Sequence, residues 1–147
     1  MTAPSTEIDQ SDLACVADSF AFVHADAQAV GRLFYETLFA AAPQLRPLFG
    51  GDLDVQGVKL MDTLHVVVAA LGHMEAVRPV IEDLARRHVA YGVRPDHYDL
   101  VGETLIGTMA RFLGSERFDP HTAAAWRRAY GVLSEAMVAA AYPDMAA

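Results

Sequence analysis

The helical period of the apolar residues constrains the fold more than any other feature of this chain. From Ser11 onward, apolar residues recur three and four positions apart, and no run alternates with a period of two for long enough to form a strand. Glycine and proline residues interrupt this pattern at intervals. The expected helices cover residues 11–23, 25–41, 43–48, 54–71, 75–90, 95–113 and 120–141. The sequence therefore predicts an all-α fold of about seven helices.

Length and composition limit the domain organisation and the partners. The 147 residues are enough for one domain, which we place at 11–142, with polar tails at 1–10 and 143–147. The net charge is −8 and no basic stripe carries interleaved aromatic residues, so we expect no nucleic-acid partner and no attraction to anionic membranes. The single cysteine, Cys15, excludes an internal disulfide. We see no apolar targeting run and nothing near the roughly 18–20 apolar residues of a membrane span, so we expect a cytoplasmic protein.

His88 lies at the end of an apolar helix face. At 3.6 residues per turn, a stripe about 100° wide joins it to four apolar residues. These are Val77, Val80, Ile81 and Leu84. An imidazole in this place is either a core histidine with a hydrogen-bond partner or a metal ligand. The other histidines lie near helix ends, in loops or on a polar face, so we expect no zinc site with three or four converging ligands.

Two more polar side chains interrupt apolar helix faces. Gln56 lies on the inward face of its helix, one turn before Leu60. It either caps the helix start or donates a hydrogen bond to something held in the interior. Tyr35 brings a hydroxyl into an apolar face. This hydroxyl either donates to a backbone carbonyl or faces the same interior-bound group as Gln56. Lys59, on the flank of the helix, is either a solvated charge or a cation at a pocket mouth.

Two glycines within helices indicate a close helix crossing. Glycine inside a helix costs about 1 kcal/mol relative to alanine. Gly31 and Gly57 lie in two different expected helices, each near one of the polar candidates. We therefore expect these helices to cross where a Cβ atom would collide.

The remaining patterns indicate core packing rather than catalysis. Tyr98, Val101 and Leu105 have ordinary core spacing, and Tyr98 could approach His88 from below. No serine has a partnered histidine and aspartate at a recognisable spacing. The glycine pair at residues 50–51 lacks the lysine and hydroxyl residue of a phosphate loop.

Six segments, in chain order and at compatible separations, resemble the globins. They are residues 33–39, 46–49, 56–61, 85–93, 97–102 and 125–130. Together they span about the whole of 11–142. The resemblance is to bacterial single-domain haemoglobins, to the globin domain of flavohaemoglobins and to neuroglobin.

The resemblance implies haem b (iron-protoporphyrin IX) as the cofactor, with His88 as the proximal ligand of the iron. The carbonyl of Leu84, one turn back, is the expected acceptor for the second imidazole N–H. Phe49 would pack on the porphyrin and Lys59 would pair with a propionate. The other residues expected around the ring are Tyr98, Val93, Val101 and Leu105.

On the opposite side of the ring, the resemblance places Tyr35 and Gln56 at the two distal polar positions and Leu60 over the iron. Diatomic gases (oxygen, nitric oxide and carbon monoxide) are the implied ligands. Donors at Tyr35 and Gln56 would stabilise polarised oxygen by about 1.5–3 kcal/mol, and carbon monoxide less.

The resemblance also has a departure. Where flavohaemoglobin-like members carry a glutamate that joins a tyrosine like Tyr98, this sequence has Ala141, and Glu135 lies almost two turns earlier. Both features weaken the case for peroxidase-type chemistry.

Three functions remain open from the sequence. The first is reversible oxygen binding for delivery or storage. The second is nitric oxide dioxygenation with an external reductase, because no reductase domain is recognisable in these residues. The third is a sensor or interaction globin, with or without haem. We expect a monomer or a weak homodimer.

Overall fold

The structure, a computed structural model, describes residues 8–142. Within this range there are six α-helices and two short 3-10 helices and no strand, so the predicted all-α fold is confirmed. The elements are α1 (Gln10–Ala25), α2 (Ala27–Ala41), η1 (Pro43–Leu48), α3 (Leu53–Ala70), η2 (Leu71–Val77), α4 (Arg78–Ala90), α5 (Pro95–Arg117) and α6 (Pro120–Ala141). The rest of the two predicted tails, residues 1–7 and 143–147, lies outside the described range.

The first helix begins slightly earlier than the periodicity predicts. The side chain of Asp9 accepts a hydrogen bond of 2.8 Å from the backbone N–H of Asp12 and caps the helix. Gln10 is therefore already helical, and the expected tail is shorter at this end.

Two backbone breaks account for the other differences in helix bounds. His73 has a non-helical backbone (φ −139°, ψ 44°), so the stretch before Arg78 is the 3-10 helix η2 rather than the start of α4. Gly114 has a φ of 79°, a conformation that glycine adopts without steric cost. It interrupts α5 at the predicted stop, after which one more turn reaches Arg117.

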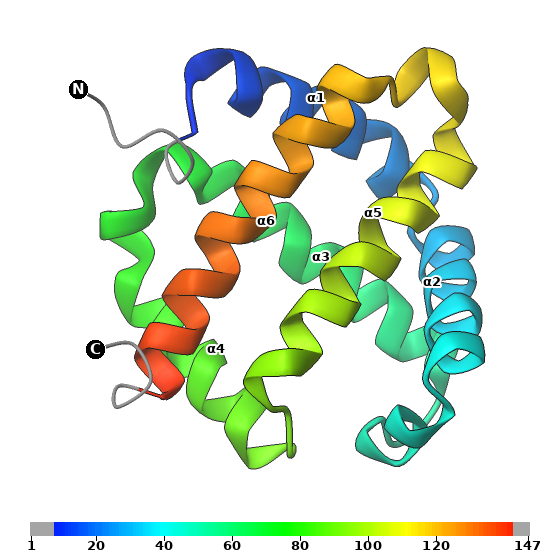
Figure 1. The fold of residues 1–147 in the computed structure, drawn as a ribbon, viewed down its shortest axis with the longest axis vertical. Helices are drawn as coiled ribbons and strands as arrows, with labels where there is room; N and C mark the ends of the chain where they lie inside the picture. Colours follow the sequence, from blue (N-terminus) through cyan, green and yellow to red (C-terminus); the bar gives the residue numbers. More distant parts are fainter. Residues whose placement is uncertain (1–7, 143–147) are drawn as a thin grey trace.

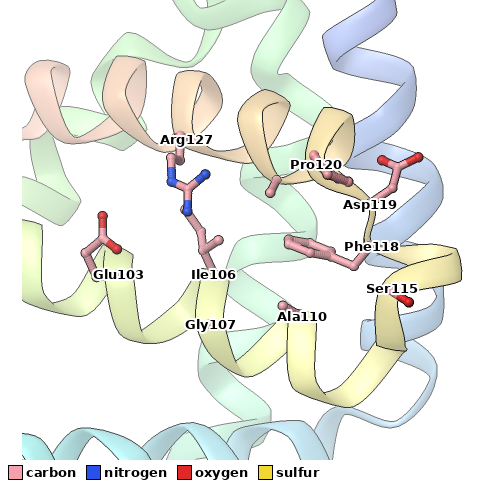
Figure 2. A pocket seen from close by; sticks show the side chains of 10 residues that line it. Glu103, Ile106, Gly107, Ala110, Ser115, Phe118, Asp119, Pro120 and Arg127 are labelled. Carbon is pink, nitrogen blue, oxygen red and sulfur yellow. The ribbon is translucent and has the colours of Figure 1, made fainter.

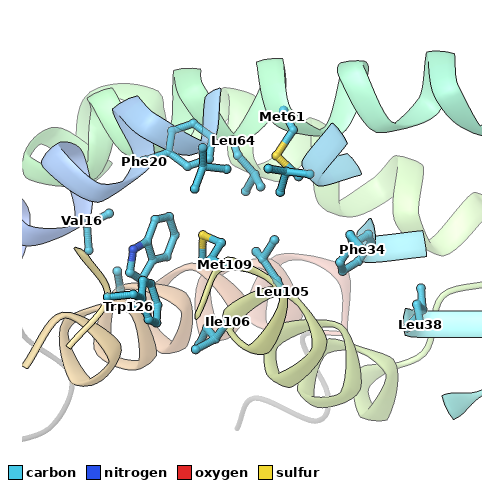
Figure 3. Close-up of a cluster of buried hydrophobic side chains, with 14 of the residues drawn as sticks. Val16, Phe20, Phe34, Leu38, Met61, Leu64, Leu105, Ile106, Met109 and Trp126 are labelled. Atoms are coloured by element: carbon cyan, nitrogen blue, oxygen red, sulfur yellow. The ribbon is translucent and has the colours of Figure 1, made fainter. Parts of the chain in front are cut away.

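The helices pack around two separate apolar clusters. In Figure 1, α5 and α6 lie in front of α3, and α4 lies beside the lower part of α6. The larger cluster joins α1, α2, α3, α5 and α6, and Figure 3 shows Phe20 and Trp126 facing Met109 at one end of it. The smaller cluster is built mainly on α4 and α6 around Ile81 and Met137. The larger cluster holds one buried polar pair, in which Trp126 Nε1 donates to Ser19 Oγ at 2.8 Å.

The predicted crossing of α2 and α3 is confirmed. A Cβ atom built on Gly31 would lie 2.7 Å from the Cα of Gly57, and one built on Gly57 would lie 3.0 Å from the Cα of Gly31. Both contacts are with backbone atoms, which cannot rotate away. The crossing fixes how α3, which carries Gln56 and Leu60, lies against α2, which carries Tyr35.

The stretch Leu53–Ala90 corrects one expectation from the sequence. Among the described residues, it contains a window that is long and apolar enough to cross a membrane by length and composition alone. The stretch is not one continuous α-helix, because the backbone break at His73 separates α3 from α4. Only 22% of that window is buried in this structure.

An ion pair joins the first and last helices. Arg128 donates two hydrogen bonds to the carboxylate of Asp12, from Nε at 2.8 Å and from Nη2 at 2.7 Å. The Asp12 side chain is only 3% exposed. The pair therefore holds α1 against α6 with a buried carboxylate that depends on its partner.

This pair should make stability depend on pH in the acid range. The hydrogen bonds from Arg128 hold the pKa of Asp12 below its usual value. The stabilisation is therefore complete above the unfolded-state pKa of about 4 and is lost as the pH falls below it through the folded-state pKa. We expect Asp12→Asn to lower the Tm by several degrees at pH 7, and this difference to shrink as the pH falls below about 4, as followed by circular dichroism.

The matched control is Asp18→Asn, an exposed aspartate on the same helix. It should leave the Tm unchanged at both pH values. A gap between Asp12→Asn and the unchanged protein that is equally large at pH 7 and pH 3 would mean that the ionised carboxylate is not what stabilises the contact.

Candidate functional site

The imidazole of His88 is oriented by its own helix. Its Nδ1 donates to the carbonyl oxygen of Leu84 at 2.7 Å, which confirms the expected partner one turn back. No described residue hydrogen-bonds to Nε2, and the side chain is half-buried at the C-terminal end of α4. With the proton on Nδ1, the lone pair of Nε2 is free to bind a metal ion.

Tyr98, in the first turns of α5, covers one side of this imidazole. The two rings stack at 21° with centroids 6.1 Å apart. Tyr98 is 8% exposed, and its hydroxyl oxygen is buried without a hydrogen-bond partner in the described part of the chain. Burial raises the pKa of this tyrosine to about 12, so the hydroxyl is neutral at physiological pH.

Tyr35 belongs to an aromatic group on the other side of the molecule's core. Its ring meets Phe49 edge-on at 5.3 Å and stacks on Phe39 at 5.7 Å. The residue is 4% exposed, and burial raises the pKa of its hydroxyl to about 12. The hydroxyl therefore stays protonated and able to donate, and none of the side-chain hydrogen bonds among residues 8–142 uses it.

The amide of Gln56 is directed at the loop that carries Phe49. Gln56 Nε2 donates to the carbonyl of Gly50 at 3.3 Å, and Arg46 Nη1 donates to the carbonyl of Phe49 at 2.9 Å. The loop is thus held by one side chain that precedes it in the chain and by one that follows it. Of the predicted neighbours on α3, Leu60 is half-buried and Lys59 is exposed.

The predicted site residues are divided between the two apolar clusters. Leu84 and Val93 pack with the smaller cluster, which includes Tyr98. The residues that pack with the larger one are Phe49, Leu60, Val101, Leu105 and Tyr35. α3 packs on α1 and α2 whereas α4 packs on α6, and α3 and α4 do not pack extensively on each other. The apolar residues predicted around the ring therefore belong to two separate clusters, one that includes residues of α3 and one that includes residues of α4.

Ala141 and Glu135 differ in their relation to Tyr98. Ala141 is half-buried in the last turn of α6 and packs with the smaller cluster. Glu135 and Tyr98 border the same surface hollow of about 460 Å³, but no hydrogen bond joins them. No carboxylate therefore reaches the Tyr98 hydroxyl within residues 8–142.

A second hollow, of about 360 Å³, lies between α5 and the start of α6. Figure 2 shows Arg127 of α6 reaching toward Glu103 and Ile106 of α5, with Phe118 beside them. It contains none of the predicted site residues.

The comparisons with known proteins agree with this geometry. The globin family model matches residues 32–137. The chain belongs to the globin family. The flavohemoprotein of Deinococcus radiodurans is 32% identical to this globin over 119 residues, which cover 79% of this chain and 29% of that protein. The flavohemoprotein of Bordetella parapertussis is 32% identical over 114 residues, covering 76% of this chain and 28% of that protein. This globin thus spans less than a third of the length of these relatives.

Membership of the globin family implies haem binding, and the described residues suit such a group. Haem is a flat apolar ring with a metal at its centre and charged groups at one edge. The two apolar clusters offer side chains that could cover such a ring, and Nε2 of His88, which has no hydrogen-bond partner among the described residues, offers a nitrogen ligand. Tyr98, whose hydroxyl is buried without a partner among the described residues, stacks its ring on that imidazole.

Several contacts of this globin were missed from the sequence. Arg46 places its guanidinium 5.5 Å from the centroid of the Phe39 ring while binding the Phe49 carbonyl. Tyr130 and Tyr142 bind backbone carbonyls near the site. The spacing of these residues is that of ordinary core or surface positions, so periodicity carried no signal for them.

Proposed function

We propose that this globin binds haem b through His88 and reversibly holds oxygen, for delivery or storage. The observation that carries the proposal is the hydrogen bond from His88 Nδ1 to the Leu84 carbonyl, 2.7 Å long, which leaves Nε2 without a partner among the described residues. It selects one tautomer and orients the ring. The lone pair of Nε2 is therefore available to a metal ion.

The residues that would hold the ring come from both apolar clusters. Phe49 and Leu60 belong to the side of α3, and Leu84 and Val93 to the side of α4. Val101 and Leu105 of α5 lie with the larger cluster. When bound, haem iron supplies a vacant coordination position for oxygen, nitric oxide or carbon monoxide. The apolar walls exclude water, which slows oxidation of the metal.

Tyr35 is the donor we expect to contact the gas ligand. The residue is only 4% exposed, and its hydroxyl is neutral and takes part in no hydrogen bond of the described residues. Gln56 binds the Gly50 carbonyl in this structure and would have to turn to act as a second donor. The side chain that is already available is therefore Tyr35.

Replacing Tyr35 by phenylalanine should speed oxygen release by about 10- to 100-fold, the effect of losing one hydrogen bond to a polarised ligand. Flash photolysis or stopped-flow mixing measures this rate. Carbon monoxide provides the internal control, because it is less polarised and its release should change much less. Equal rates of oxygen release from the two proteins would mean that the hydroxyl does not face the ligand.

The proposal as a whole is tested by absorption spectra of the purified protein in the ferric state, in the ferrous state and after exposure to oxygen. We expect a strong haem band in all three and a stable spectral change on adding oxygen to the ferrous protein. A colourless protein, or one that oxidises at once without a distinct oxygenated spectrum, would contradict reversible oxygen binding.

Nitric oxide dioxygenation with a separate reductase is the second candidate. It is favoured by relatives whose name, flavohemoprotein, denotes a flavin as well as a haem. We would then expect sustained consumption of nitric oxide when a flavin reductase and oxygen are supplied. Tyr35→Phe should lower that turnover while oxygen binding persists. No consumption above that of free haem would remove this candidate.

A further inference from the structure

Three aromatic rings contact one another in a closed triangle beside the loop that follows η1. Tyr35 and Phe39 stack at 15° with their centroids 5.7 Å apart. The Phe49 ring meets both of them edge-on, with its centroid 5.3 Å from that of Tyr35 and 5.5 Å from that of Phe39. Stacked and edge-on arrangements at these distances are both favourable. We call these three rings the aromatic triangle.

Two corners of the aromatic triangle are set by one helix and the third by a loop. Tyr35 and Phe39 lie one turn apart on α2, so the helix itself brings their rings together. Phe49 is the first residue after η1, and the exposed glycines Gly50 and Gly51 follow it. The position of Phe49 therefore decides whether the triangle closes.

Arg46 contacts the aromatic triangle at two of its corners. Its Nη1 donates to the carbonyl oxygen of Phe49 at 2.9 Å, and its Cζ lies 5.5 Å from the centroid of the Phe39 ring. The backbone N–H of Phe49 donates in return to the Arg46 carbonyl at 3.1 Å. A planar guanidinium can lie over a ring and donate within its own plane at the same time. Arg46 thus ties the loop residue Phe49 to a ring of α2.

The packing of these rings matters for Tyr35 because its hydroxyl has no partner that would orient it. The hydroxyl takes part in no hydrogen bond among residues 8–142, and the residue is 4% exposed. The direction in which the hydroxyl points is therefore set by the neighbours of the ring. A hydrogen bond weakens steeply as its angle departs from linearity, so a tilt of the Tyr35 ring would weaken any bond that the hydroxyl donates.

We propose that Arg46 is a positioning residue that directs the Tyr35 hydroxyl toward the gas ligand by holding Phe49 against the Tyr35 and Phe39 rings. This inference rests on the proposed function, since it concerns the donor expected to contact the gas. Arg46 is exposed on η1 and acts through the aromatic triangle rather than by contact with the ligand.

The test is a double-mutant cycle on the haem-loaded full chain. We expect Arg46→Ala to release oxygen about two- to fivefold faster, the size of an exposed cation–π contact. In the Tyr35→Phe background the same substitution should change the rate no further, because the hydroxyl it positions is gone. An equal acceleration in both backgrounds, or none in either, would overturn the proposal.

The matched control is Arg111→Ala. Arg111 is also exposed, lies on α5, and takes part in no hydrogen bond, ion pair or cation–π contact among the described residues. Its replacement removes the same charge from the protein and should leave the rate of oxygen release unchanged. A rate that rises as much as in Arg46→Ala would mean that the net charge, and not the aromatic triangle, is responsible.

A vibrational measurement separates positioning from a general loss of stability. The C–O stretching band of the carbon monoxide complex responds to a donor beside the ligand. We expect Arg46→Ala to shift this band toward its position in Tyr35→Phe, whereas Asp12→Asn, which weakens the contact between α1 and α6, should leave it in place. A band that stays in place in Arg46→Ala would contradict the role of Arg46.

Amide hydrogen exchange distinguishes failure of this inference from failure of the proposed function. If the purified protein holds no haem, the proposed function fails and positioning toward a gas fails with it. The contact of Arg46 with Phe49 should still slow exchange of the Phe49 amide, with faster exchange in Arg46→Ala than in Arg111→Ala. Haem binding together with equal exchange in these two variants would leave the proposed function standing and overturn the role of Arg46.

Discussion

Replacing His88 by alanine should abolish stable haem retention. The substitution removes an imidazole whose Nδ1 donates to the Leu84 carbonyl and whose Nε2 has no hydrogen-bond partner among the described residues. Loss of a group that only orients a metal ligand typically costs 10- to 100-fold in affinity, so loss of the ligand itself should cost more than about 100-fold. The measurement is the haem content per chain after purification and the absorption spectrum of the ferrous protein.

The control for this experiment is His121→Ala, which removes an exposed imidazole whose nearest described partner is the Ser11 hydroxyl at 3.5 Å. It should keep its full haem content. In His88→Gly, added imidazole should restore part of the haem spectrum, because it can occupy the space of the lost side chain. Unchanged haem content and ligand spectra in His88→Ala would refute the assignment of the iron ligand.

Replacing Gly31 by alanine should destabilise the protein, although alanine is the better helix former. The new Cβ atom would lie 2.7 Å from the Cα of Gly57 and 2.9 Å from its carbonyl carbon. Relieving this contact requires α2 and α3 to separate, and such overpacking costs about 1–3 kcal/mol. Urea unfolding followed by circular dichroism gives the change in the free energy of unfolding.

Gly107→Ala tests the opposite sign at a matched position. Gly107 also lies inside a helix, but a Cβ atom built on it meets nothing within 4 Å. The higher helix propensity of alanine should then raise the free energy of unfolding by about 0.5–1 kcal/mol. If Gly31→Ala were as stable as Gly107→Ala, the close crossing would not be a constraint on this fold.

Separating α2 and α3 should also change the positions of two predicted site residues. Tyr35 lies one turn after Gly31 on α2, and Leu60 lies one turn after Gly57 on α3. A shift at the crossing would therefore move Tyr35 and Leu60 relative to His88 on α4. A substitution that destabilises the crossing should therefore also alter the binding of a gas ligand.

Local features of this protein were predictable from the sequence. The helix positions follow from the spacing of apolar residues and from the interruptions by glycine and proline. The bond from His88 to Leu84 spans one helical turn, so it needs no tertiary information. The crossing at Gly31 and Gly57 was predictable because a glycine that weakens a helix needs a compensating reason.

Other features depend on which side chains the folded chain brings together. Gln56 was predicted to lie on the inward face of its helix, where it would either cap the helix start or donate to something in the interior, and in this structure its amide donates to the Gly50 carbonyl. The bonds from Tyr130 to Tyr98 and from Tyr142 to Val93 join residues 32 and 49 positions apart. No periodicity encodes such pairs.

The physical reason for the division is the range of the interactions. Helix formation and a hydrogen bond one turn away are decided by neighbours along the chain, so the sequence by itself determined the helices and the orientation of His88 on α4. The partners of Gln56, Tyr130 and Tyr142 were decided only by the tertiary structure, because a flexible polar side chain bonds whichever group the packing of distant helices places within reach.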